Sequence, residues 1–104
     1  MEGIRVTLGE VLLFESKLPP GVYLLWENES SHPVYIGKSL IRCDQRLTEH
    51  WQGGPYANRE LNAAMHLHEP YCLDWIVEVY PLQDMQNAVQ LEKQLLEEFS
   101  PLLS

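Results

Sequence analysis

Two short runs of branched and aromatic residues, separated by a polar segment, constrain the fold of this chain more than any other feature. The first run, Gly21 to Glu27, contains no internal breaker and predicts a β-strand. The second, Val34 to Gly37, predicts another strand, and residues 28–33 between them are polar and end in proline. Two strands joined by so short a connection predict an antiparallel β-hairpin.

The hairpin predicts where two tyrosines lie. With the turn centred near residue 29, Tyr23 on the first strand lies roughly opposite Tyr35 on the second. Opposed residues of an antiparallel pair point to the same face of the sheet. We therefore expect the two phenols to stand side by side.

The rest of the chain predicts helices and one further strand. Apolar spacing and flanking Gly and Pro residues predict these elements. The first half of the chain is expected to hold a short helix or turn at 7–18 and a helix from an N-cap at Ser39 to about Trp51. A helix from Asn58 to about His68, a strand from Leu73 to Tyr80, and a helix from about Met85 to Ser100 with Asp84 as its N-cap follow. The expected fold class is α/β (α+β): a small three-stranded antiparallel sheet flanked by helices.

Length and hydropathy limit the class of protein. At 104 residues we expect a single domain over 1–104, with its core at about 18–104 and a short N-terminal extension at 1–17. No 18-residue apolar run is present, so we expect no membrane span, and the N-terminal residues do not resemble a signal peptide. The expected compartment is the cytoplasm, where Cys43 and Cys72 are buried free thiols.

Charge is distributed unevenly along the chain. The net charge is −8, which disfavours strong nonspecific binding to nucleic acid. The segment from Lys38 to Arg59 carries a local balance of +2, and the remaining residues carry −10. Affinity for a polyanion is therefore expected to be modest unless another domain or subunit supplies it.

Three basic side chains line one face of the second predicted helix. Arg42, Arg46 and His50 are spaced by four residues, which places them on one side of a helix. A solvated helix face is the alternative interpretation of this spacing. A separate set, His66, His68 and Cys72, suggests zinc but lacks a fourth ligand.

Glu92 is exceptional among the polar residues of the last predicted helix. On a helical wheel at about 100° per residue, the residues within about 60° of it are all apolar. They are Met85, Ala88, Val89, Leu95, Leu96 and Phe99. A carboxylate on such a face must be paired, protonated or bound to a metal ion. The alternatives are a metal ligand, an ion pair with an arginine such as Arg46, or a position at the edge of the core.

In this order the residues resemble the GIY-YIG endonuclease family. The motifs that carry the resemblance are Gly21-Val22-Tyr23, Tyr35-Ile36-Gly37 with Lys38 after it, Arg46-x-x-x-His50, and a final helix from Glu92 to Pro101. The resemblance covers roughly residues 18–104. It implies a small three-stranded sheet with helices around it, and a nuclease that cuts DNA with the help of a divalent metal ion.

The resemblance also implies roles for individual residues. Glu92 would anchor Mg²⁺ or Mn²⁺, and Tyr35 or Tyr23 would accept the proton of the attacking water. Arg46 would bind the scissile phosphate, with Arg42 as the alternative because Arg46 lies one residue further from Gly37 than in the commonest form. Such a role for a tyrosine needs a nearby cation, since the ordinary pKa is near about 10.

The remaining implied roles are supporting ones. His50 would share proton transfer or hold a phosphate oxygen, and Lys38 and Arg42 would contact substrate. Gly21 and Gly37 are structural, and Gly37 is expected to allow close approach of backbone between sheet and helix. The two tyrosines have a plainer interpretation, as half-buried aromatics of a sheet.

Two other functional classes fit the sequence. One is a noncatalytic nucleic-acid- or protein-binding module with the same fold, favoured by the acidic charge and by Ser104 where the family often has asparagine. The other is a small protein-binding domain that uses the acidic outer side of the last helix, at Glu97 and Glu98. If the chain is a nuclease, its DNA target would be selected by a separate DNA-binding domain or subunit.

Overall fold

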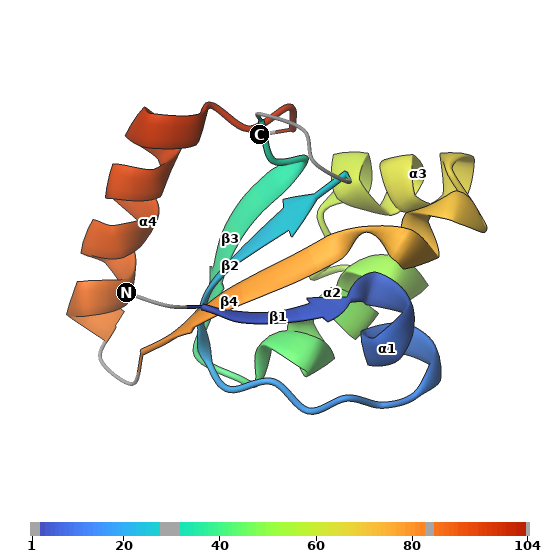
Figure 1. Cartoon of the computed structure of the whole chain (residues 1–104), viewed down its shortest axis with the longest axis horizontal. Coiled ribbons are helices and arrows are strands. Elements are labelled where there is room, and N and C mark those ends of the chain that lie inside the picture. The colour runs from blue at the N-terminus through green and yellow to red at the C-terminus, as the bar shows by residue number, and fades with distance from the viewer. Residues whose placement is uncertain (1–2, 28–31, 83–84, 104) are drawn as a thin grey trace.

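A single sheet with helices on both faces forms the molecule (Figure 1). The computed structural model describes residues 3–27, 32–82 and 85–103. Its elements in chain order are β1 (Ile4–Thr7), α1 (Leu8–Leu13), β2 (Gly21–Trp26), β3 (Tyr35–Ser39), α2 (Cys43–Gln52), α3 (Arg59–Leu67), a 3₁₀ turn (Tyr71–Asp74), β4 (Ile76–Pro81) and α4 (Met85–Phe99). The expected class, an antiparallel sheet flanked by helices, is confirmed.

The sheet has four strands in the order β1-β4-β2-β3, rather than the expected three. The extra strand is β1, which pairs with β4 over four residues from Ile4↔Val79 to Thr7↔Ile76. Sequence patterning did not predict it because a four-residue edge strand with an exposed Arg5 has too few positions to show alternation. Immediately after it, Thr7 caps α1 through a capping box with Glu10.

The hairpin of β2 and β3 forms in a register that differs by two residues from the expected one. Tyr23 pairs with Gly37, and Tyr35 pairs with Leu25. The expected direct opposition of the two tyrosines is therefore wrong, but a shift of two residues keeps side chains on the same face. The two rings remain neighbours, with centroids 6.1 Å apart. The turn itself, at 28–31, lies outside the described residues.

The start of α2 also differs from the prediction. Ser39 is the last residue of β3, and its hydroxyl donates to the carbonyl oxygen of Ile41 at 2.7 Å instead of capping a helix. Arg42 occupies the N-cap position, so α2 begins at Cys43. Leu40 accordingly lies outside the helix and is exposed. The predicted N-cap of the last helix, Asp84, is outside the described residues.

Two hydrophobic clusters hold the layers together. The larger one lies between the sheet and α1, α2 and α3, and includes Tyr23, Leu25, Leu47, Leu61 and Val77. The smaller one lies between the other face of the sheet and α4, and is formed by Val22, Leu24, Ile36, Ala88 and Leu95. Burial of each Val, Leu or Ile side chain among them contributes roughly 1.5–3 kcal/mol. Within the part of the chain that the structure describes, no helix is long and apolar enough to cross a membrane.

Candidate active site

The side chains singled out by the sequence come from both faces of the sheet and surround its β3 edge. Tyr23 and Tyr35 belong to the face that α2 covers, and α2 itself contributes Arg46 and His50. Lys38 follows Tyr35 by three residues and therefore points to the opposite face, toward α4 and Glu92. The strand that carries Tyr35 and Lys38, β3, lies at one edge of the sheet.

Glycine at position 37 is required by the ring of Tyr23. A Cβ atom there would lie 2.5 Å from the phenol oxygen of Tyr23 and 2.6 Å from its Cζ atom. The expected reason, close approach of helix and sheet backbone, is wrong, because the close neighbour is this aromatic side chain. At Gly21, φ is +153°, and a Cβ atom would overlap the carbonyl oxygen of Tyr80 on the neighbouring strand β4.

Tyr23 and His50 form a buried hydrogen-bonded pair. The Tyr23 oxygen lies 3.0 Å from Nε2 of His50, and Tyr23 is 1% exposed while His50 is fully buried. The other ring nitrogen of His50, Nδ1, accepts from the backbone N–H of Asn58 at 2.9 Å. Both nitrogens of His50 are therefore engaged inside the protein.

Burial keeps both members of this pair neutral. Burial raises the pKa of the Tyr23 phenol well above its usual value, and the neighbouring Tyr35 raises it further. Burial also lowers the pKa of His50 to about 4, with a further contribution from the Arg46 guanidinium. At neutral pH the pair is an uncharged phenol and an uncharged imidazole.

Tyr35 lies in a different environment from Tyr23. It is only partly buried, and its ring lies 6.1 Å from that of Tyr23 and 5.8 Å from that of His50. Among the described residues, none makes a hydrogen bond to the hydroxyl of Tyr35. It is therefore the more accessible of the two phenols.

The two candidate arginines line different pockets. Arg46 donates through Nη1 to Oε1 of Glu49 at 3.1 Å and to the carbonyl oxygen of Tyr56 at 2.8 Å. With Lys38 it lines an open pocket of about 470 Å³, the β3-edge pocket, whose other lining residues are Ser39, Leu40, Ile41, Glu49 and Tyr56.

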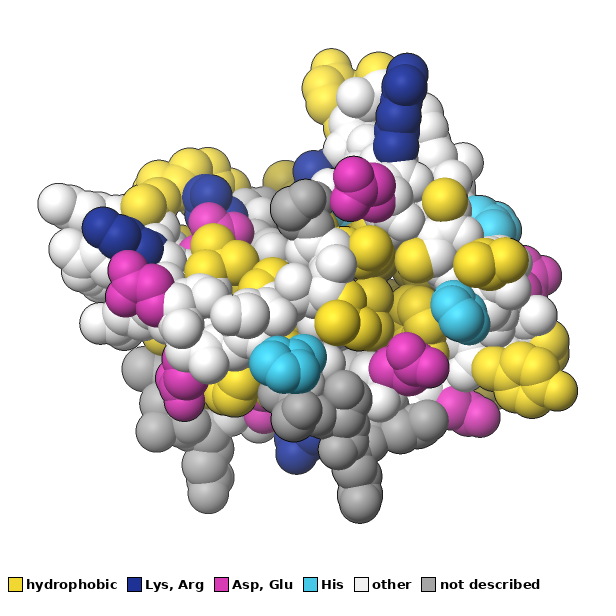
Figure 2. All heavy atoms as spheres, turned by 90° about the horizontal axis from the view of Figure 1, so that it is seen from above, with side chains coloured by type: hydrophobic (Ala, Val, Ile, Leu, Met, Phe, Trp, Pro, Cys, Tyr) yellow, Lys and Arg dark blue, Asp and Glu magenta, His cyan; other side chains and the backbone are white. Residues whose placement is uncertain are grey.

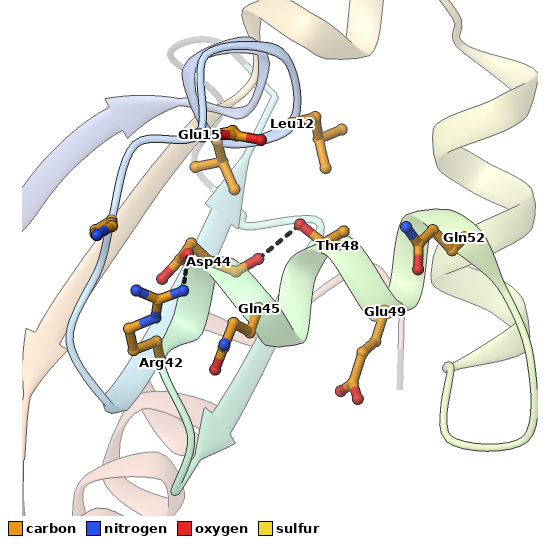
Figure 3. A pocket seen from close by; sticks show the side chains of 10 residues that line it. Leu12, Glu15, Arg42, Asp44, Gln45, Thr48, Glu49 and Gln52 are labelled. Carbon is orange, nitrogen blue, oxygen red and sulfur yellow. Dashed lines mark hydrogen bonds and ion pairs between the residues drawn. The ribbon is translucent and has the colours of Figure 1, made fainter.

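Arg42 faces a second pocket, of about 530 Å³, on the side of α1 (Figure 3). There its Nη2 atom lies 3.4 Å from a carboxylate oxygen of Asp44. The spacing of four residues predicted a common face for the basic residues of α2, but Arg42 is the N-cap residue and lies outside the helical turns. Arg46 therefore lines the β3-edge pocket with Lys38, and Arg42 lines the pocket on the side of α1.

Glu92 is paired with a lysine. Nζ of Lys38 donates to Oε1 of Glu92 at 2.8 Å, and the two side chains are 38% and 19% exposed. The buried side of α4 is formed by Ala88 and Leu95, whereas Met85, Val89 and Leu96 are exposed. Glu92 therefore lies at the border of the apolar face instead of its middle.

The charges of Arg46 and Glu92 both affect the pKa of Tyr23. Arg46 lowers and Glu92 raises the pKa of Tyr23, although burial has the largest effect. Both charges therefore act on the same phenol from opposite faces of the sheet. The five candidate catalytic residues are brought into one region around the β3 edge.

Glu92 is the candidate ligand for a divalent cation at this site. Among the described residues, no group of three His, Cys, Asp or Glu side chains is close enough to hold a metal ion. A single accessible carboxylate such as Glu92 suits Mg²⁺, which keeps several waters and accepts further oxygens from a phosphate. Of the candidate zinc residues, His66 instead stacks on Trp51 and lies 2.8 Å from its carbonyl oxygen.

Sequence reasoning missed several residues that arrange the site. Glu49 and Tyr56 hold Arg46, and Asn58 holds His50. Glu49 follows Arg46 by three residues, a helical spacing that favours an ion pair and was a usable signal. The contacts of Tyr56 and Asn58 are made by backbone atoms, which leave no mark in the side-chain pattern.

Comparison with known proteins gives one family and one fold. A sequence model described as the GIY-YIG catalytic domain matches residues 19–103. The chain is similar in structure to the GIY-YIG N-terminal endonuclease domain of UvrC from Thermotoga maritima. That structure is a tyrosine-to-phenylalanine point mutant bound to its catalytic divalent cation. The TM-score is 0.60, with 20% sequence identity over 89% of each chain. At this identity the likeness concerns the fold. No curated protein matches the chain.

Proposed function

The chain belongs to the GIY-YIG family, and we propose that it is a divalent-metal-dependent endonuclease that hydrolyses phosphodiester bonds in DNA. The observation that carries the proposal is the position of Glu92, held 2.8 Å from Lys38 beside the β3-edge pocket that Lys38 and Arg46 line. A candidate oxygen ligand for a cation thus lies beside two side chains that can bind phosphate, and the charges of Glu92 and Arg46 both affect the pKa of Tyr23. The UvrC domain of the same fold, which binds a catalytic divalent cation, supports this proposal.

Glu92 is the proposed anchor for Mg²⁺ or Mn²⁺. When bound, such an ion neutralises charge on the phosphate and orients the groups that react. Its binding would compete with the ammonium of Lys38 for the carboxylate of Glu92. Lys38 would then turn toward a substrate phosphate, since its side chain is already 38% exposed at the pocket.

Arg46 is the proposed ligand of the scissile phosphate. A guanidinium binds a phosphate through two parallel N–H donors and stays charged at every working pH. The contacts of Arg46 to Glu49 and Tyr56 both use the Nη1 atom. The other nitrogen atoms of the guanidinium are therefore available to a phosphate in the β3-edge pocket.

Tyr35 is the proposed proton acceptor for the attacking water. A general base must reach the water and be able to lose its own proton first. Tyr23 fails the second requirement, because it is bonded to His50 and its pKa is strongly raised by burial. Tyr35 is partly exposed on the same face and is the better candidate.

Affinity for DNA would depend on a further DNA-binding domain or subunit. The chain has a net charge of −8. On the face shown in Figure 2, the Lys and Arg side chains of the described residues are scattered and form no continuous basic band. Contacts to a few phosphates at the active site would give weak, strongly salt-dependent binding.

A nicking assay tests the proposal directly. Supercoiled plasmid and branched, nicked and linear duplexes are incubated with the protein and Mg²⁺, Mn²⁺ or EDTA. We expect metal-dependent cleavage that Glu92→Gln abolishes, while the circular dichroism spectrum and melting temperature of the variant stay close to those of the wild type. The isosteric amide keeps the shape of the side chain but not its charge. Equal cleavage by the variant would refute the proposed metal anchor.

A noncatalytic binding module is the second candidate function. It is favoured by the pairing of both site cations with acids, Lys38 with Glu92 and Arg46 with Glu49, on a chain with net negative charge. This alternative predicts binding of DNA without cleavage under every metal condition. A protein-binding role at Glu97 and Glu98 of α4 predicts instead a partner whose binding needs no DNA.

A further inference from the structure

The hydrogen bond between Tyr23 and His50 has a direction that a third residue determines. The backbone N–H of Asn58 lies 2.9 Å from Nδ1 of His50. A backbone N–H can only donate, so Nδ1 must be the acceptor and must carry no proton. The single proton of the neutral imidazole is then on Nε2.

That proton is directed at Tyr23. Nε2 lies 3.0 Å from the phenol oxygen, and the Nε2–H group has no lone pair with which to accept. The phenol oxygen is therefore the acceptor in this bond, although a phenol beside a histidine is usually written as the donor. The hydroxyl proton of Tyr23 must point away from His50.

We propose that Tyr23 is a hydrogen-bond donor toward the reaction centre, oriented by His50, whose tautomer is set by the backbone of Asn58. This inference rests on the proposed nuclease function for its purpose but not for its geometry. Tyr23 would neither gain nor lose a proton. It would donate to an oxygen that carries negative charge during the reaction, either that of the attacking water or that of the phosphate.

The hydroxyl proton of Tyr23 has no acceptor among the described residues. Among the described residues, no group other than His50 makes a hydrogen bond to the phenol oxygen. The ring lies against Gly37, where any side chain would come within 2.5 Å of that oxygen, and beside the ring of Tyr35. The hydroxyl proton therefore needs an acceptor that water or substrate supplies.

The protonation behaviour of the pair agrees with this arrangement. A doubly protonated His50 would direct its Nδ1–H at the N–H of Asn58, and two donors would then face each other. The pKa of His50 is lowered to about 4, which keeps the imidazole in its neutral form. Burial keeps the proton on Tyr23 by raising its pKa.

Two asparagine side chains hold the start of α3, and with it Asn58, against α2. Oδ1 of Asn58 accepts from the N–H of Leu61 and caps α3. Nδ2 of Asn62 donates to the carbonyl oxygens of His50 and Trp51 at 2.9 and 3.0 Å, which ties α3 to the last turn of α2. Asn58, Asn62 and His50 are thus positioning residues for Tyr23.

Nitrogen NMR of the wild-type protein tests the direction of the bond without any substrate. In a protein labelled with [¹⁵N]histidine, two-bond ¹H–¹⁵N correlations distinguish a protonated ring nitrogen from an unprotonated one. We expect His50 to show a protonated Nε2 and an unprotonated Nδ1 from pH 8 to pH 5. The opposite tautomer, or an imidazolium in this range, would overturn the inference, whether or not the protein cleaves DNA.

Two variants of His50 test the purpose of the bond. His50→Gln keeps an N–H donor near the position of Nε2 but loses the acceptor at Nδ1, whereas His50→Asn keeps the acceptor and loses the donor. If the donor orients Tyr23, kcat falls by about 100-fold in His50→Asn, as for loss of one oriented donor, with KM unchanged. His50→Gln should stay within about tenfold of the wild type. Equal losses, or a larger loss in His50→Gln, would contradict the proposed role.

Discussion

The two faces of the β2–β3 hairpin hold polar groups in opposite ways. Under α2, Tyr23 and His50 are buried, neutral and joined by a directional hydrogen bond. Toward α4, Lys38 and Glu92 are partly exposed, charged and joined by an ion pair. The first face fixes a geometry, while the second holds charges that a metal ion or a phosphate can displace.

The energies of the two arrangements explain this division of roles. A buried polar group that loses its partner costs about 1–3 kcal/mol, so the pair of Tyr23 and His50 resists rearrangement. A partly exposed ion pair contributes about 0–1 kcal/mol, so Lys38 can leave Glu92 at little cost. We call the face with Tyr23 and His50 the rigid side of the hairpin, and the face with Lys38 and Glu92 its exchangeable side.

The largest expected loss of cleavage rate distinguishes the roles of Tyr35 and Tyr23. If Tyr35 is the general base, Tyr35→Phe lowers kcat by about 10²–10⁴-fold. Tyr23→Phe loses a donor but no base, and should lower kcat by a smaller factor, about 10²-fold. Single-turnover cleavage rates at saturating Mg²⁺ measure both. A larger loss in Tyr23→Phe would exchange the roles of the two tyrosines.

The next largest loss of cleavage rate distinguishes the roles of Arg46 and Arg42. Removing a group that stabilises charge in the transition state costs about 10²–10³-fold in rate, which is the loss expected for Arg46→Met. Arg42→Met is the matched variant, because Arg42 pairs with Asp44 in the other pocket and should lose less than about threefold. Cleavage rates under the same conditions distinguish them. If Arg42→Met is the more damaged variant, the phosphate binds on the α1 side of α2.

Acid should weaken the rigid side. The pKa of folded His50 is about 4, below its ordinary value near 6.5, so the unfolded chain binds this proton more readily. The stability that comes from keeping His50 neutral is fully present above about pH 6.5 and is lost as the pH falls toward 4. By pH 5 the loss from this residue is about 2 kcal/mol. Urea denaturation at pH 8 and pH 5 measures it, and His50→Gln should show a smaller difference between the two.

The smallest effect concerns the exchangeable side. If Glu92 anchors the metal ion, the ion must displace Lys38, and Lys38→Met should tighten Mn²⁺ binding by about two- to fivefold, the value of one partly exposed ion pair. Isothermal titration of Mn²⁺ into the wild type and the variant gives the two dissociation constants. Weaker binding in Lys38→Met would mean that the lysine assists the metal site instead of competing with it.

Local patterns predicted the elements well and their relations less well. Strands β2, β3 and β4 and helices α2 to α4 follow from apolar periodicity and breakers, whereas β1 is too short to show a pattern. The hairpin register depends on turn geometry at 28–31, so the pairing of Tyr23 with Gly37 was not predictable from the strands alone.

The candidate site was predictable in its side chains but not in its contacts. The motifs select both phenols, Arg46 and Glu92 as candidates, because such chemistry needs those side-chain types, and the roles of these residues stay predictions. The partner of Glu92 is Lys38, from a different element, and the acceptor state of His50 depends on the backbone of Asn58. Contacts of this kind are produced by the tertiary packing of α2, α3 and α4 around the sheet.

We expect the β3 edge to bind a divalent cation through Glu92, the partner of Lys38. Crystals soaked in Mn²⁺ and measured for anomalous scattering test it most directly. We predict one anomalous peak at about 2.1 Å from a carboxylate oxygen of Glu92, with Lys38 turned away and no peak in crystals of Glu92→Gln. A peak at another site, or an unchanged peak in the variant, would contradict it.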